Sequence, residues 1–369
     1  MAVRAVKLAE VSPGVMMPDG GASACRVVKG PLALPVKAPA TLSDHGDVVD
    51  AVLNEDGHPR VVSLPADPIP PGPLPVREIF ADAVATGLSL RCAMAGDIIF
   101  CPDRDGAVHR ARRTGGDDHV VASSRKGSRI SACTFGPAHA AFAYMASRAT
   151  SEGWVSEAWL GVDDEPPVRI SEDGSGATAV TLAPRGESIM ALMIDARAAL
   201  TAMHARPLTY DASLHLGEDA VIFVGGPGDR GTAGALAAPR RGPAWALLPT
   251  SEDVGHFGVA IVQMHDPPQV DEPVSWLLYP NGLDPAPIAT AWGRERIWVG
   301  LIRPSAPQPK APRILEIGDL RQGASFRSIG VISTHSSPSD VSLAIDSHAA
   351  LWVAWVDAAG SWVERLACK

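Results

Sequence analysis

Few residues of this 369-residue chain have the types and spacing that catalysis requires. The eleven histidines include no His-x-His or His-Glu-x-x-His pair, and the Gly-x-Ser-x-Gly turn of many serine hydrolases is absent. The five cysteines include no Cys-x-x-Cys, so nothing supports a zinc ribbon. The glycine-rich segment 225–231 lacks the Gly-Lys-Ser/Thr ending of a phosphate-binding loop. The motifs therefore favour binding over catalysis.

Six polar residues remain as candidates for a ligand site, because each lies at or just before the start of a predicted strand. They are Arg129, Asp173, Asp284, His335, Ser339 and Asp340. Asp284 and Asp340 could hold a central Ca²⁺, on the axis of the ring of strands predicted below, and no other cofactor is expected. Together with His335, they could also serve as acid–base groups or metal ligands of an enzyme. The alternative is that all six residues cap strands and hydrogen-bond turns.

The spacing of two cysteines predicts a disulfide. Gly96-Asp97 suits the centre of a type II′ hairpin turn, which places Cys92 opposite Cys101 at a non-hydrogen-bonded pair. The Cα atoms of such a pair approach to about 4.5 Å, which is within reach of a disulfide. We expect the bond in an oxidising compartment and two buried thiols in a reducing one.

One basic cluster stands out in the chain. Its members are His109, Arg110, Arg112, Arg113, Arg125, Lys126 and Arg129. Solvated side chains on an outer strand are the simplest explanation. If these side chains share one face, they could instead dock an acidic peptide or a partner protein.

The elements that must position these residues form a repeat. A short apolar strand recurs along the chain, and its bulky anchors are Ile99, Phe142, Met190, Trp245, Trp298 and Trp352. Successive anchors are 43, 48, 55, 53 and 54 residues apart. A strand of small residues precedes each anchor strand, and segments with period-two alternation follow it. Four strands in each repeat of about fifty residues are typical of a β-propeller blade.

In repeat shape, residues 85–369 resemble the bacterial six-bladed propellers of the broad TolB-like, sialidase-like and WD40-like group. The signature motifs of that group are missing. There is no Gly-His…Trp-Asp pair, and segment 171–176 has the glycines of a sialidase Asp-box misplaced. The resemblance implies an all-β fold, a β-propeller of six blades with about four antiparallel strands each. In such a fold, ligands bind where several loops converge, at one end face or in the central funnel.

The N-terminal segment, residues 1–84, should close the ring of a single-domain protein. The last repeat supplies three strands, so an N-terminal strand at 25–29 or 60–64 must complete it. If the first of these strands closes the ring, Cys25 and Cys368 could staple the closure. The alternative is two free thiols on frayed chain ends.

A proline-rich stretch between residues 65 and 75 follows the closing segment. It is expected to form an extended connector to the first blade. As an alternative to six blades, a hairpin with strands at 47–54 and 59–64 could begin a seventh blade.

Composition excludes several classes of protein. Apolar residues make up 46% of the chain, which supports a large core. Lys plus Arg is 32 and Asp plus Glu is 41, and the net charge of −9 argues against a nucleic-acid or anionic-membrane partner. No apolar run approaches the about 18 residues of a membrane span. The first residues lack a signal peptide, which favours a cytoplasmic location, with a processed periplasmic or secreted form as the alternative.

These observations predict a non-catalytic β-propeller that holds a peptide, a protein or a small ligand on one end face or in its central funnel. The alternative is a hydrolase or lyase of a specialised pathway with a site in the funnel. A third interpretation is a periplasmic or surface scaffold, in which Cys92 and Cys101 would be oxidised.

Overall fold

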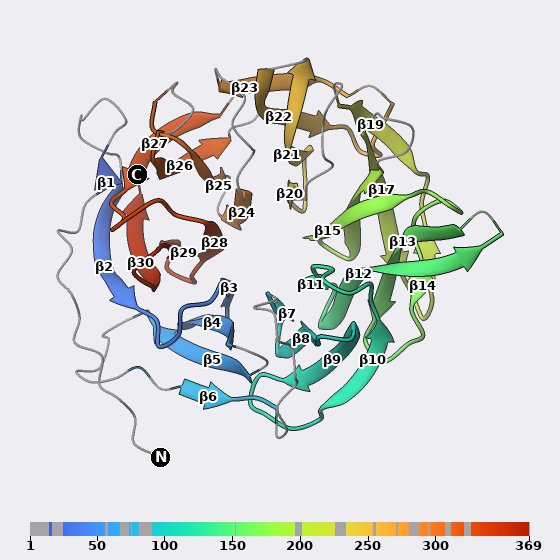
Figure 1. The fold of residues 1–369 in the computed structure, drawn as a ribbon, viewed down its shortest axis with the longest axis horizontal. Helices are drawn as coiled ribbons and strands as arrows, with labels where there is room; N and C mark the ends of the chain where they lie inside the picture. The colour runs from blue at the N-terminus through green and yellow to red at the C-terminus, as the bar shows by residue number, and fades with distance from the viewer. Residues whose placement is uncertain are drawn as a thin grey trace.

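The computed structural model is a ring of seven antiparallel sheets, and every regular element in its described part is a β-strand (Figure 1). Among these residues no helix is long and apolar enough to cross a lipid bilayer. The structure describes residues 15–16 and 25–368, with gaps at 56–57, 67–73, 75, 81–90, 152, 196–200, 226–233, 254–255, 271, 280–287, 294–295, 307–310 and 321–325.

Each sheet is one blade, numbered along the chain, with its first strand nearest the axis (Figure 1). Blade 1 contains β3 (Ala40–Asp44), β4 (Val48–Glu55), β5 (His58–Pro65) and β6 (Val76–Glu78). Blade 2 contains β7 (Ala93–Ala95), β8 (Ile98–Pro102), β9 (Ala107–Arg112) and β10 (His119–Ser123). Blade 3 contains β11 (Ser131–Phe135), β12 (His139–Thr150), β13 (Gly153–Val162) and β14 (Val168–Arg169).

The remaining four blades complete the circle. Blade 4 contains β15 (Ala177–Arg185), β16 (Ser188–Asp195), β17 (Ala202–Tyr210), β18 (Leu214–Leu216) and β19 (Ala220–Val224). Blade 5 contains β20 (Ala235–Ala237), β21 (Ala244–Asp253), β22 (His256–Met264) and β23 (Val274–Tyr279). Blade 6 contains β24 (Ile288–Gly293), β25 (Arg296–Pro304), β26 (Arg313–Leu320), β27 (Arg327–Ile332) and β1 (Val15–Met16). Blade 7 contains β28 (Asp340–Ile345), β29 (Leu351–Val356), β30 (Ser361–Cys368) and β2 (Cys25–Ala33).

The seventh sheet corrects the prediction of six blades and matches the stated alternative. Blade 1 lies within the segment that was expected to hold closing strands and a connector. Val49 is the second residue of β4, 50 residues before Ile99, the second residue of β8. Valine packs well in a sheet but lacks the bulk that identified the other repeats, so this blade was not counted. Most of the proline-rich stretch, residues 67–73 and 75, lies outside the described residues.

An N-terminal strand closes the ring, as predicted. The strand is β2, which pairs with β30 at the outside of blade 7, whereas residues 60–64 belong to β5. In this pairing Cys25 faces Cys368, and a disulfide joins them with their Cα atoms 4.0 Å apart. Closure of this kind leaves blade 7 with a full set of four strands.

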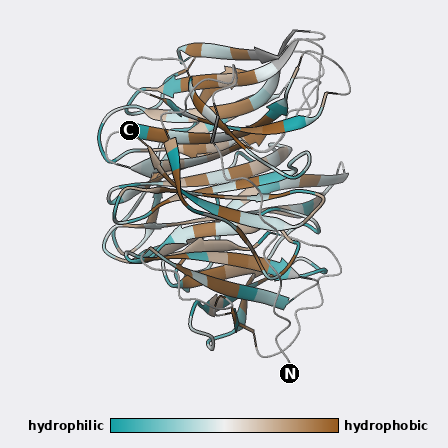
Figure 2. Cartoon of the chain, turned by 90° about the vertical axis from the view of Figure 1, so that its left-hand side faces the viewer, coloured by the Kyte–Doolittle hydropathy of each residue, from teal (hydrophilic) through white to brown (hydrophobic). Residues whose placement is uncertain are grey.

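The core is divided among the seven interfaces between neighbouring blades, each of which buries its own apolar cluster. Between blades 2 and 3, for example, the rings of Phe100 and Phe142 stack with their centroids 4.4 Å apart. Apolar bands run along successive blades in the side view (Figure 2). The strands are apolar on both faces because each sheet is covered on both sides, and this produces the short apolar runs of the repeat.

All six anchors lie on second strands, and five of them pair with an alanine of the first strand. Met190, Trp245, Trp298 and Trp352 pack against the following blade. Ile99 and Phe142 pack against the preceding blade instead. An offset of one residue along a strand reverses the face that a side chain occupies, which explains the difference.

Hydroxyl side chains join neighbouring first strands around the axis. The Thr41 hydroxyl donates to the Cys92 carbonyl at 2.5 Å, and the Thr181 hydroxyl donates to the Gly234 carbonyl at 3.0 Å. The Thr290 hydroxyl donates to Leu236 in the same way, at 2.9 Å. The first strand of a blade has one unpaired edge, and these bonds satisfy part of its backbone.

Candidate functional site

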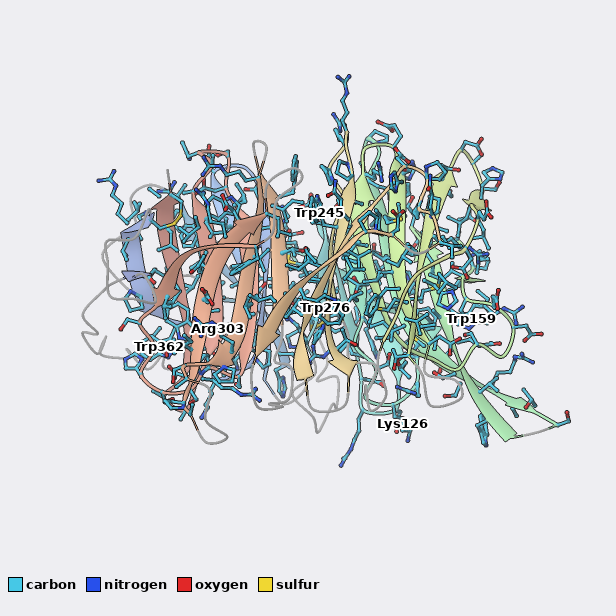
Figure 3. The ribbon with its side chains drawn as sticks, turned by 90° about the horizontal axis from the view of Figure 1, so that it is seen from above. Lys126, Trp159, Trp245, Trp276, Arg303 and Trp362 are labelled. Carbon is cyan, nitrogen blue, oxygen red and sulfur yellow. A yellow bond between two sulfur atoms is a disulfide. The ribbon has the colours of Figure 1, made fainter. Side chains whose placement is uncertain are left out.

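The propeller has two end faces that differ in their loops. We call the face with the connections between blades, such as residues 124–130 and 170–176, the crossover face. The face with the turns between first and second strands, such as residues 238–243, is the turn face. Lys126 lies at the crossover face, and Trp245 lies toward the turn face (Figure 3). The six candidate residues of the sequence analysis were all expected at strand starts, on the crossover face.

The structure does not bring these candidates together in one described site. Arg129 and Asp173 are exposed in two different connections between blades. Ser339 donates its backbone N–H to the Val356 carbonyl at 2.8 Å. Asp284 lies outside the described residues.

His335 and Asp340 each have a partner within the ring. The His335 ring stacks on Trp362 with centroids 4.1 Å apart, and its Nδ1 lies 3.6 Å from the buried Asp357 carboxylate. Asp340 Oδ1 lies 3.4 Å from Nη1 of Arg91. These contacts account for both side chains as parts of the framework.

Arg91 is a central link that the sequence analysis did not identify. Its Nη2 donates to the carbonyls of Ala40 at 2.6 Å and Val341 at 3.1 Å, and its Nε donates to the Thr41 hydroxyl. One guanidinium therefore joins blades 1 and 7 to the start of blade 2. Within the described ranges no group of three or more His, Cys, Asp or Glu side chains is placed to hold a metal ion. The central Ca²⁺ stays a prediction.

Cys92 and Cys101 are joined by a disulfide in blade 2, with their Cα atoms 4.5 Å apart. This is the separation expected of a non-hydrogen-bonded pair. Cys133 is a buried free cysteine, and burial raises the pKa of its thiol to about 12. Its thiol is therefore protonated at neutral pH and unreactive.

The basic cluster divides into two parts. The part on and beside β9 is neutralised by carboxylates, since His109 lies 3.2 Å from Asp103 and Arg113 lies 2.7 Å from Asp50. Arg110 is bound to Asp117 at 2.8 Å. The second part, Arg125, Lys126 and Arg129, lies on the crossover face between blades 2 and 3.

A cavity of about 1010 Å³ lies on the turn face between blades 5 and 6. It was not predicted. Its lining residues are Pro239, Arg240, Arg241, Gly242, Pro243, Trp245, Trp292, Arg296, Ile297 and Leu320. Two features of the sequence could have indicated it. Arg240 and Arg241 lie between two prolines in the turn after β20, and Trp292 lies near the end of β24, the first strand of blade 6.

Two tryptophans shape the apolar part of this cavity. Trp245 is buried, whereas Trp292 is 46% exposed at the end of β24. Arg185 of blade 4 holds the turn of blade 5, because its Nη2 donates to the Gly242 carbonyl at 2.9 Å and lies 2.7 Å from Asp266. Gly242 has a φ of 89°, which favours glycine at this point of the turn.

The cavity is strongly basic although the protein is acidic overall. Among the described residues of its lining, three are arginines and none is Asp or Glu. Arg240 and Arg241 are exposed, and neither forms an ion pair with a described residue. The guanidinium of Arg296 lies 5.9 Å from the ring centroid of Trp298. Arginine guanidinium groups bind carboxylate, phosphate and sulfate with paired hydrogen bonds, so this arrangement suits an anion.

A second cavity, of about 10 Å³, lies on the crossover face of blade 4. His204 Nδ1 lies 3.4 Å from Asp219 there, and the hydrogen bond to Asp219 raises the pKa of His204. Ser175 Oγ and Asp219 Oδ1 line the cavity without a hydrogen-bond partner. This space suits one water molecule, so we interpret it as part of the framework.

The fold and its cavities define the chain as a seven-bladed β-propeller. No model of a protein family and no curated protein sequence matches it. A Trypanosoma rangeli sialidase solved with 2,3-difluorosialic acid is similar, with a TM-score of 0.49 and 9% identity over 96% of this chain and 59% of the sialidase chain. YCF48 from Cyanidioschyzon merolae has a TM-score of 0.46 and 12% identity, over 93% of this chain and 98% of its own. A lectin from Aleuria aurantia solved with α-methyl-L-fucoside has a TM-score of 0.42 and 12% identity, over 74% and 92%.

Proposed function

We propose that this protein is a non-catalytic binding propeller that holds an anionic ligand in the cavity between blades 5 and 6. The observation that carries the proposal is the lining of a cavity of about 1010 Å³, whose described residues include Arg240, Arg241 and two tryptophans but no Asp or Glu. Ligand pockets usually measure about 300–1000 Å³, so a small molecule fits.

The two kinds of lining residue indicate the shape of the ligand. Arg240 and Arg241 bring two positive charges to the mouth of the cavity and favour a carboxylate, phosphate or sulfate group. The exposed ring of Trp292 offers a flat apolar surface for stacking. The ligand class is therefore an anionic group attached to a flat ring.

The same lining favours binding over catalysis. Its described residues are all Pro, Arg, Gly, Trp, Ile or Leu. None of these transfers a proton near neutral pH or acts as a nucleophile. The alternative of a hydrolase or lyase depends on Asp284, His335 and Asp340, and the described contacts of His335 and Asp340 give it no support.

Isothermal titration calorimetry with 1-naphthyl phosphate tests the proposal, with 1-naphthol and inorganic phosphate as the two halves of the probe. We expect 1-naphthyl phosphate to bind at least about tenfold more tightly than either half, because the ring and the anion both contribute. The double variant R240Q/R241Q should weaken binding about tenfold or more, and added salt should weaken binding to the wild type.

The matched control is R26Q/R104Q, which removes the same charge from two exposed arginines elsewhere on the ring. It should bind 1-naphthyl phosphate as the wild type does. Equal binding by R240Q/R241Q and the wild type, or no binding of 1-naphthyl phosphate to the folded wild type, would overturn the proposal.

A further inference from the structure

Strands β12 and β13 continue beyond their blade as a two-stranded ribbon (Figures 1 and 3). The ribbon runs from the pair Ala146–Glu157 to the pair Thr150–Gly153. On one side, β11 pairs with β12 only as far as Ala143, and on the other side β14 pairs only with Trp159 and Leu160. Both edges of the ribbon therefore lack a neighbouring strand in the part of the chain that the structure describes.

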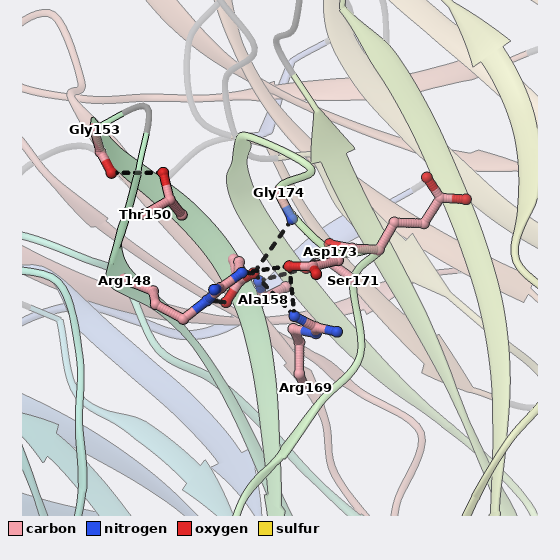
Figure 4. A network of polar contacts seen from close by, with 10 residues as sticks. Arg148, Thr150, Gly153, Ala158, Arg169, Ser171, Asp173 and Gly174 are labelled. Atoms are coloured by element: carbon pink, nitrogen blue, oxygen red, sulfur yellow. Dashed lines mark hydrogen bonds and ion pairs between the residues drawn. The ribbon is translucent and has the colours of Figure 1, made fainter.

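Ion pairs fix the base of the ribbon. Glu157, whose side chain is fully buried, accepts hydrogen bonds from Arg148 at 3.0 Å and from Arg169 at 3.1 Å (Figure 4). Asp173 bonds to the same two arginines, and the Gly174 N–H donates to Glu157 at 3.3 Å. Isolated two-stranded ribbons are marginally stable, so this network holds a projection that the core does not support.

One edge of the ribbon, the edge of β12 on the side of β11, presents backbone groups for a further strand. We call it the inner edge. Met145 marks this edge, because its N–H donates to the Ser128 hydroxyl at 3.2 Å and its carbonyl accepts from the Arg125 N–H at 2.5 Å. Alternate residues of a strand direct their N–H and C=O groups to the same edge. The N–H and C=O groups of Ser147 and Ala149 therefore also point to the inner edge. Both residues lie beyond Met145, the residue whose backbone is bound by the loop 124–130.

Exposed cationic side chains flank this edge. Arg125 and Arg129 belong to the loop that caps Met145, and neither forms an ion pair with a described residue. Arg125 also reaches over the ribbon, where its Nη1 lies 3.4 Å from the Ser156 hydroxyl. Lys126 lies between them in the sequence and is paired with the exposed Asp105. The charge at this edge favours an acidic partner.

Trp154 adds an apolar anchor near the tip. Its side chain is 76% exposed, the highest value among the large exposed apolar residues of the described chain. Trp154 pairs with Ala149, and it lies on the same ribbon face as Ser156, two residues along the strand. An exposed aromatic side chain of this size is a frequent centre of binding energy in protein interfaces.

We propose that the inner edge of β12, at residues 147–149, binds an extended acidic segment of a partner protein by β-strand addition. The backbone of Ser147 and Ala149 supplies the ladder of hydrogen bonds. Arg125 and Arg129 pair with carboxylates of the segment, and Trp154 contacts its apolar side chains. This site is separate from the cavity between blades 5 and 6, so the two proposals stand independently.

Fluorescence anisotropy with a fluorescein-labelled peptide of Glu-Glu-Val-Val repeats tests this proposal, because each face of such an extended segment carries both Glu and Val side chains. The variant A149P removes an N–H from the free edge and leaves the bonds to β13, because Ala149 is not hydrogen-bonded to its opposite residue. We expect A149P to weaken binding about tenfold, whereas the matched control A149T, which keeps the N–H, changes it less than about twofold. R125Q/R129Q should weaken binding about tenfold and reduce its salt dependence.

Several outcomes would overturn the proposal. One is equal binding by A149P and A149T when circular dichroism shows that both are folded. The others are equal binding of a peptide of Lys-Lys-Val-Val repeats, and no binding of the Glu–Val peptide to the wild type. If A149P does not fold, binding of the peptide by R125Q/R129Q tests the proposal by itself. This variant should fold, because Arg125 and Arg129 are exposed and lie outside the core. Sedimentation showing a dimer of the wild type that A149P abolishes would assign the edge to a second copy of this chain instead.

Discussion

Cys25 and Cys368 face each other in adjacent strands although 343 residues separate them, and a disulfide joins them where the ring closes. A cross-link that spans so much of the chain removes many conformations from the unfolded state. The variant C25S/C368S should therefore lower the free energy of unfolding by about 3–5 kcal/mol, measured by urea denaturation without reductant.

The other disulfide provides the control. Cys92 and Cys101 are separated by 9 residues, so C92S/C101S should lower the free energy of unfolding less, by about 2–3 kcal/mol. A larger loss for C92S/C101S than for C25S/C368S would contradict the role assigned to the closing disulfide.

Glu364 lies on β30, the strand that pairs with the closing strand β2, and it makes the stability of the protein sensitive to pH. It is 2% exposed, and burial raises the pKa of its carboxyl from 4.5 to about 7. Because the folded pKa lies above the unfolded value, the folded state loses stability as pH rises from 4.5 to 7. E364Q has no carboxyl group at this position and should not show this loss. The free energy of unfolding of E364Q minus that of the wild type should therefore increase by about 3 kcal/mol between acidic and neutral pH. Urea denaturation at several pH values measures the free energy of unfolding of both proteins. The same pH dependence for E364Q and the wild type would contradict this account. E78Q, at an exposed carboxyl, is the control.

Asp346 stabilises the interface between blades 7 and 1. Its Oδ2 accepts from Trp352 Nε1 at 2.9 Å and from Arg365 Nε at 2.7 Å. Burial opposes ionisation of the carboxyl, but hydrogen bonds from Ala350, Arg365 and Trp352 outweigh it and lower the pKa of Asp346. The stability that this group contributes is therefore present above the usual value of 3.8 and is lost as pH falls through the lower folded pKa.

The variant D346N tests this contribution. It leaves the guanidinium of Arg365 buried without its carboxylate and should lower the free energy of unfolding at pH 7 by about 3–5 kcal/mol. D105N, at an exposed carboxylate in a surface ion pair with Lys126, should be within about 0.5 kcal/mol of the wild type. A loss for D346N no greater than for D105N would show that the contacts of Asp346 contribute little.

Gly161 leaves room for the ring of Phe142 on the neighbouring strand. A Cβ atom at Gly161 would overlap Cε1 of Phe142, closer than van der Waals contact allows. G161A should therefore lower the free energy of unfolding by about 1–3 kcal/mol, because Phe142 also stacks on Phe100 and cannot move freely. G360A is the matched control, since its Cβ would meet nothing closer than 3.8 Å. Equal melting temperatures of the two variants would contradict this account.

Much of the fold followed from local patterns. The anchors Trp245, Trp298 and Trp352 recur because each packs its blade against the next, and such packing favours a bulky apolar residue near the start of the second strand. The closing strand followed from the missing fourth strand of the last repeat. Blade 1 was only the alternative to six blades, because Val49 at the second position of β4 has a smaller side chain, which the pattern of bulky anchors does not detect.

The sites depended on contacts between distant segments. By itself the sequence determined that apolar strands repeat, that they must form a closed ring, and that no familiar catalytic motif is present. Only the tertiary structure decided which polar residues meet. It placed Asp340 next to Arg91, and it brought Arg240, from a turn of blade 5, and Trp292, on β24 of blade 6, into the lining of one cavity. The physical reason is that the pattern of apolar residues in a strand reflects burial of that strand alone. A cavity such as the one between blades 5 and 6 depends on how two sheets pack together, and that cannot be deduced from either segment by itself.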